Sequence, residues 1–103
     1  MLIYCCHKFG GDKRNIKRAE RLIHDLQVND LNNTYISPIH AFGYLKYEEI
    51  GYDQEINLCK SLLEVCNMIY VLSDVSEGVR REVEHAKKIG ISIGYMDCHI
   101  GDA

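Results

Sequence analysis

The residues best suited to chemistry in this sequence lie in one stretch, SDVSEGVRREVEHAKKIG (73–90). Ser76 and Gly78 stand where a helix is expected to begin, and Glu82 follows within its first turns. A helix start presents free N–H groups and the positive end of a dipole, so small residues there let an anion approach the backbone. The same pattern is typical of an N-cap on an amphipathic surface helix, and both interpretations stay open at this point.

Hydrophobic patterning indicates which elements would position these residues. Apolar runs predict strands at 2–6, 34–37, 68–72 and 91–95. Helical spacing of apolar residues predicts helices around 16–26, over 53–66 and around 79–89, the last with Val79, Val83, Ala86 and Ile89 inward. Segment 39–52 has no firm periodicity and is predicted to be mostly loop.

The alternation of strands and helices predicts the fold class. We expect one α/β domain over 1–103, a small Rossmann-like or flavodoxin-like three-layer sandwich with a parallel sheet of four strands or five. Ligands of such sheets bind beyond the carboxyl ends of the strands, where segments 7–15, 38–52 and 73–78 would meet. The GxGxxG fingerprint and the P-loop are absent, so we expect no dinucleotide, no ATP and no other cofactor.

Composition narrows the partners and the compartment. A net charge of -3 argues against binding a nucleic acid polymer. Five cysteines without a CxxC pair favour the reducing cytoplasm, and no signal peptide or membrane span is expected. Cys5, Cys6 and His7 are adjacent, so on a strand they would alternate between faces, and we expect no metal site.

Four segments, in order, resemble the nucleoside 2-deoxyribosyltransferase superfamily, most closely its small bacterial and phage members. Those members are in turn related to the 2′-deoxynucleoside 5′-phosphate N-hydrolases. The resemblance covers roughly residues 2–95. The matching segments are KFGGDKRN with NIKRA (8–19), ISPIHAFGYL (36–45), LLEVCNMIYVL (62–72) and SEGVRREVEHAKKIGISI (76–93), the last resembling a Ser-x-Gly-x-x-x-Glu-x-x-x-Ala motif.

The resemblance implies a function and a set of site residues. Glu82 would be the nucleophile that attacks the anomeric carbon of a deoxynucleoside, and Ser76 and Gly78 would hold a 5′-phosphate. We also expect Arg80 to help keep Glu82 charged. Further substrate contacts are expected from Lys8, Gly10, Asp12, Asn15, His40, Asp53 and Asp74. The implied partners are a small nucleoside or nucleotide and further copies of the chain, as a homodimer or larger homo-oligomer.

The sequence departs from the family in two places. The family's aspartate on the second helix aligns with Cys59, for which Asp53, Glu55 or Asp74 could substitute, and only MDCHIGDA (96–103) follows the last strand. Three functions therefore stay open. The first is an enzyme that acts on an N-glycosidic bond, which the register of Glu82 favours. The second is a non-catalytic module that binds a nucleotide-derived ligand such as a signalling nucleotide. The third is a subunit whose helices mainly build an oligomer.

Overall fold

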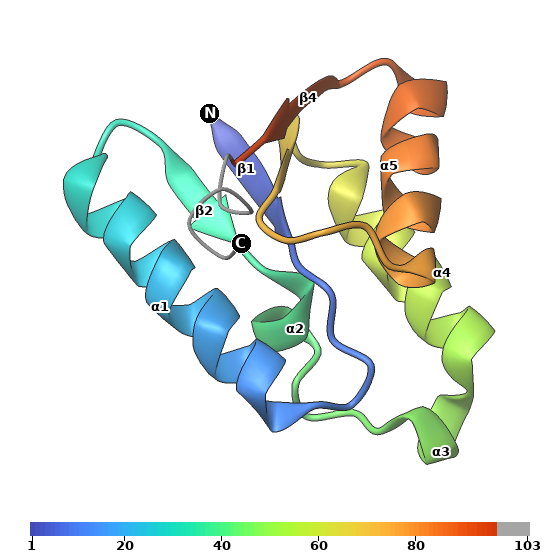
Figure 1. The fold of residues 1–103 in the computed structure, drawn as a ribbon. Coiled ribbons are helices and arrows are strands. Elements are labelled where there is room, and N and C mark those ends of the chain that lie inside the picture. Colours follow the sequence, from blue (N-terminus) through green and yellow to red (C-terminus); the bar gives the residue numbers. More distant parts are fainter. Residues whose placement is uncertain (97–103) are drawn as a thin grey trace.

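The computed structural model describes residues 1–96 and contains a four-stranded sheet in which every pairing is parallel (Figure 1). The strand order is β2-β1-β3-β4. The strands are β1 (Leu2–Cys6), β2 (Thr34–Ile36), β3 (Met68–Val71) and β4 (Ser92–Tyr95). The four predicted strands and the parallel α/β class are confirmed.

Helices cover both faces of this sheet. They are α1 (Lys13–Asn29), α2 (Pro38–Ala41), α3 (Tyr47–Ile50), α4 (Tyr52–Leu63) and α5 (Glu77–Ile89). In Figure 1, α1 lies on one side of the sheet, and α4 and α5 lie together on the other. The chain leaves β1 toward β2 and leaves β3 toward β4, so the loops after the adjacent strands β1 and β3 diverge. This is the topological switch point at which such sheets bind ligands.

The prediction that 39–52 is mostly loop is wrong. Two short helices, α2 and α3, lie in or border this segment, and α4 already begins at Tyr52. Pro38 starts α2 because its fixed φ suits the first helical position. Each short helix spans about one turn, too little for a period of 3.6 residues to show in the sequence.

Two details of the helix predictions also differ from the structure. Helix α4 ends at Leu63, earlier than the predicted Cys66. Ile89, predicted to face inward, is 36% exposed because it lies in the last turn of α5, just before the helix ends. Gly90 ends that helix with a φ of 79°, a left-handed conformation that a glycine adopts without strain.

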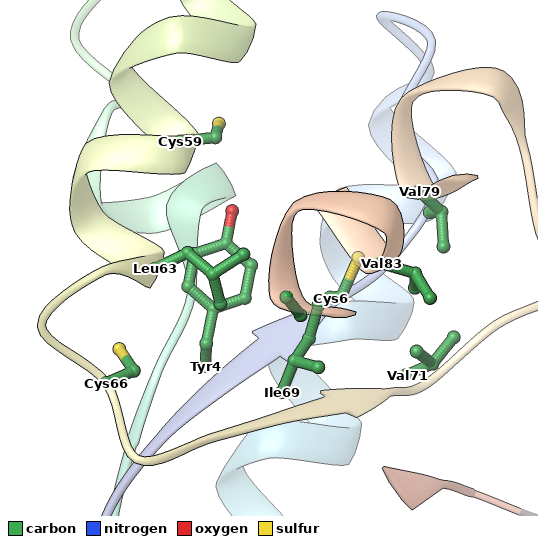
Figure 2. Close-up of a cluster of buried hydrophobic side chains, with 10 residues drawn as sticks. Tyr4, Cys6, Cys59, Leu63, Cys66, Ile69, Val71, Val79 and Val83 are labelled. Atoms are coloured by element: carbon green, nitrogen blue, oxygen red, sulfur yellow. The ribbon is translucent and has the colours of Figure 1, made fainter. Parts of the chain in front are cut away.

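The main core lies between the sheet and the helices α4 and α5. Tyr4 and Cys6 of β1 belong to this core, whereas Cys5 between them does not, as expected from the alternation of side chains along a strand. Figure 2 shows the Tyr4 ring beside Leu63, and Cys6 near Ile69 and Val83. Each fully buried side chain of the size of Leu63 contributes about 2 kcal/mol of transfer free energy.

None of the helices within residues 1–96 is both long and apolar enough to cross a lipid bilayer. The cysteines of this part of the chain are free and buried, at positions Cys5, Cys6, Cys59 and Cys66.

Candidate functional site

A cavity of about 400 Å³ opens at the carboxyl edge of the sheet, at the switch point between β1 and β3. It is bounded by the loop after β1, by α1, α2 and α4, and by the start of α5. The lining residues are His7, Lys8, Phe9, Gly10, Asn15, Pro38, Ile39, Tyr52, Glu55, Ile56, Cys59, Ser76, Glu77, Gly78, Val79 and Glu82.

The structure brings together part of the site expected from the sequence. Among the expected site residues, the ones that line the cavity are Glu82, Ser76, Gly78, Lys8, Gly10 and Asn15. The others are engaged outside the lining. Asp12 caps α1, His40 pairs with Glu20 at 3.7 Å, Asp53 pairs with Arg81 at 3.1 Å, and Asp74 pairs with Lys8 at 2.8 Å.

Glu82 is a buried carboxylate on the inner face of α5, with only 6% of its surface exposed. The Tyr4 hydroxyl donates a hydrogen bond to Glu82 Oε1 at 2.6 Å. The Cys6 thiol donates to the other oxygen, Oε2, at 2.8 Å. Figure 2 shows that the side chains of both donors project from β1 toward α4 and α5. Their hydrogen bonds therefore hold this carboxylate from the side of the sheet.

Burial raises the pKa of the Glu82 carboxyl, while hydrogen bonds from Cys6, Tyr4 and Cys59 act in the opposite direction. The same burial, together with the charge of Glu82, raises the pKa of Cys59 to about 12 and those of Tyr4 and Cys6 well above their usual range. The thiols of Cys6 and Cys59 are therefore protonated at neutral pH. They serve as hydrogen-bond donors to Glu82 and not as nucleophiles.

The expectation that Arg80 supports the charge of Glu82 is wrong. Arg80 lies on the outer face of α5, where its guanidinium pairs with Glu77 and Glu84. Residues three and four apart are neighbours on a helix surface, which makes these pairs geometrically natural. The donors that stabilise ionised Glu82 are thus uncharged groups of β1 and α4.

The start of α5 forms another wall of the cavity. Ser76 Oγ accepts a hydrogen bond from the Val79 N–H at 3.3 Å, so this serine caps the helix and also lines the cavity. A Cβ at Gly78 would lie 3.0 Å from the Tyr52 hydroxyl oxygen, so the missing side chain lets Tyr52 close over the helix start. The Tyr52 ring is held in turn by Arg81, whose guanidinium carbon is 5.6 Å from the ring centroid.

The loop after β1 is fastened to the loop after β3. The Lys8 N–H donates to Ser73 Oγ at 2.9 Å, and the Lys8 ammonium pairs with Asp74. His7 holds the same loop through Nδ1, which lies 2.6 Å from the Lys8 carbonyl oxygen. Its Nε2 lies 3.0 Å from an Arg18 nitrogen, and because a guanidinium only donates, His7 is neutral and donates through Nδ1–H. Burial also lowers the pKa of His7.

Sequence reasoning missed several residues that shape this site. Segment 7–15 is expected at the edge where ligands bind, because it directly follows a buried strand, but for His7 itself only a metal-ligand role is considered from the sequence. From the sequence, Tyr4 is placed only in a strand, and Cys6 is considered only as a strand residue or a metal ligand. Their spacing of two residues is the signal that both point to one face. The sequence predicts that Tyr52 lies at the end of a loop, and nothing in its context indicates that it packs on Gly78.

Within residues 1–96, no group of three or more His, Cys, Asp or Glu side chains is arranged to hold a metal ion. Searches against protein-family models and curated protein sequences give no match to this chain.

Proposed function

We propose that this protein cleaves or transfers the N-glycosidic bond of a deoxynucleoside, a nucleoside or their 5′-monophosphates, with Glu82 as the nucleophile. One observation carries the proposal. A single cavity at the switch point joins a buried carboxylate, Glu82, to the start of α5 at Ser76 and Gly78. The resemblance of the surrounding segments to the nucleoside 2-deoxyribosyltransferase superfamily agrees with this arrangement and supplies the substrate class.

The chemistry follows from the two parts of the cavity. The phosphate or 5′-hydroxyl group lies against the backbone at the start of α5 and near Lys8, where N–H groups and the helix dipole favour an anion. The anomeric carbon then faces Glu82, whose oxygen displaces the base and forms a glycosyl ester. Water or a second base resolves the ester, which gives hydrolysis or transfer respectively.

A second candidate function is binding of a nucleotide-derived ligand without chemistry. Two observations favour it. Burial raises the pKa of Glu82 and no cation pairs with this carboxylate in the described part of the chain, so a protonated Glu82 can act as a hydrogen-bond donor to a ligand. In addition, Cys59 stands where the superfamily has an acid, and burial keeps its thiol protonated.

The deciding experiment incubates the purified protein with a panel of deoxynucleosides, ribonucleosides and their 5′-monophosphates, with and without a free acceptor base, and follows released or exchanged base by chromatography. The variants are Glu82→Ala and, as a matched control on the exposed face of the same helix, Glu84→Ala. Turnover that Glu82→Ala abolishes and Glu84→Ala retains supports catalysis. No turnover, with thermal stabilisation by a nucleotide that survives Glu82→Ala, contradicts it and supports the binding function.

We further propose that the protein works as a homo-oligomer in the reducing cytoplasm. Strands β2 and β4 are the edges of the sheet as described, and Leu31, at 84% exposure, is a large apolar residue on the surface. Sedimentation velocity at micromolar concentration is expected to show a dimer or larger species, and a monomer at all concentrations contradicts this.

The cytoplasmic location is tested by the state of the thiols. Thiol titration of the denatured protein is expected to find all five cysteines reduced.

A further inference from the structure

A second cavity of about 250 Å³ adjoins the first. The two cavities share Phe9 and Glu55, and the second extends toward the segment between α2 and α3, where it is lined by Gly43 and Leu45. Glu55 therefore stands at the boundary between the space next to Glu82 and a smaller space beyond it. A ligand that fills both spaces passes directly by the Glu55 carboxyl.

Helix α4 determines which of its acids reaches this boundary. Glu55 lies one turn before Cys59 on the same face of α4, and both residues line the first cavity. Asp53 lies two residues earlier, and its side chain is 86% exposed and paired with Arg81. Of the acids on α4 that could replace the superfamily's aspartate, Glu55 is the one that faces the cavity.

The electrostatics of Glu55 agree with its position. Its carboxyl forms no ion pair with the described residues. Burial raises the pKa of this carboxyl, and the charge of Glu82 raises it further. Ionisation of Glu82 therefore favours the protonated form of Glu55, which places one carboxylate and one carboxylic acid along the same cavity.

We propose that Glu55 is the general acid that protonates the departing base and that the second cavity receives this base. The inference rests on the proposed function and adds to it a second catalytic residue and a site for the leaving group. Phe9 and Leu45 offer apolar surfaces to a flat heteroaromatic ring, and Lys46 and Glu48, which also line this cavity, offer polar groups to its edge.

The reaction balances with water as the only co-reactant. An oxygen of ionised Glu82 forms a bond to the anomeric carbon as the carbon–nitrogen bond breaks. The electron pair of that bond stays on the base nitrogen, which receives the proton of Glu55. Water then attacks the anomeric carbon, gives one proton to the Glu55 carboxylate and releases Glu82 as a carboxylate.

The test compares leaving groups that differ in their need for a proton. One pair is 2′-deoxyguanosine and its 7-methyl derivative, whose base departs neutral without protonation. A second pair is 2′-deoxyuridine and 5-fluoro-2′-deoxyuridine, whose base is the better leaving anion. The assay uses whichever pair, as nucleoside or 5′-monophosphate, the wild-type protein turns over. We expect Glu55→Gln to lower kcat/KM roughly 10²- to 10⁴-fold for the poorer leaving group and less than about tenfold for the better one.

Two further variants make the result specific. Glu64→Gln, at the exposed end of α4, is expected to keep both rates, and Glu55→Asp is expected to recover part of the selective loss. Circular dichroism and thermal unfolding of Glu55→Gln check that the fold is retained. Equal losses on both substrates, no loss on either, or a selective loss in Asp53→Asn instead would overturn the role of Glu55 while leaving Glu82 as nucleophile. Absence of turnover by the wild-type protein would overturn the proposed function and this inference together.

Discussion

The two faces of helix α5 carry carboxylates in opposite surroundings. On the outer face, Arg80 pairs with Glu84 and with Glu77, which lies at the helix start and also lines the cavity, and all three side chains are about half exposed. On the inner face, Glu82 is buried and receives its hydrogen bonds from the uncharged Tyr4 and Cys6. The exposed pairs cost little to form and contribute little. A buried carboxylate without a cation is unfavourable for folding, and such groups cluster at functional sites.

The largest effect on stability is expected from Tyr4→Phe, which removes the hydroxyl bound to Glu82 Oε1. An ionised, buried oxygen then lacks its donor, so the free energy of unfolding should fall by about 1–3 kcal/mol at pH 8. Urea denaturation measures this. The matched control is Tyr35→Phe, whose hydroxyl binds the accessible Asp30 at 2.7 Å, and water can replace that bond. Equal losses in the two variants would show that burial does not distinguish the two carboxylates.

Stability should also depend on pH through Glu82. Burial raises the pKa of this carboxyl in the folded chain above its ordinary value of 4.5. Between the unfolded and folded pKa values the folded state binds more protons, so the free energy of unfolding falls as pH rises through that window. The stabilising contribution is complete below the unfolded pKa and is lost above the folded one. Each pKa unit of difference corresponds to about 1.4 kcal/mol.

Glu82→Gln cannot ionise and should lack this decline, whereas Glu84→Gln should keep the wild-type slope. Unfolding by urea at intervals from about pH 4 to about pH 8 separates the variants. Parallel curves for wild-type protein and Glu82→Gln would mean that Glu82 titrates with its ordinary pKa in spite of its burial.

A smaller effect is expected from Gly78→Ala at the start of α5. The added methyl carbon would lie 3.0 Å from the Tyr52 hydroxyl, which has to move into the cavity or away from the helix. We expect roughly tenfold weaker binding of a nucleoside 5′-monophosphate, about 1.4 kcal/mol, as measured by calorimetry. The double variant with Tyr52→Phe removes the crowded oxygen and should recover most of the affinity. No recovery would place the cause of the loss elsewhere.

The smallest effect belongs to the outer face. Arg80→Ala should lower the free energy of unfolding only slightly, and the loss should shrink in high salt because exposed ion pairs are screened. Turnover should not change. A loss of activity in Arg80→Ala would restore the sequence-based expectation that this guanidinium acts on Glu82.

The strands and long helices were predictable because their signals are local. Continuous apolar runs marked β1 and β3, and helical spacing marked α1, α4 and α5. The residues that line the cavity beside Glu82 were partly predictable, since ligands of parallel sheets bind at a known edge. The donors to Glu82 were not, because Tyr4 and Cys6 lie more than seventy residues away in sequence and meet it only through packing. The direction of Arg80 likewise depended on which face of α5 became buried.

The link between the loops after β1 and β3 bears on how fast a ligand can bind. The Lys8 backbone donates to Ser73, and the Lys8 side chain pairs with Asp74, so both rims of the cavity are already ordered before a ligand arrives. Little conformational entropy remains to be lost at this edge on binding. Association should therefore follow a single fast step whose observed rate rises linearly with ligand concentration, without the plateau that a slow loop closure produces.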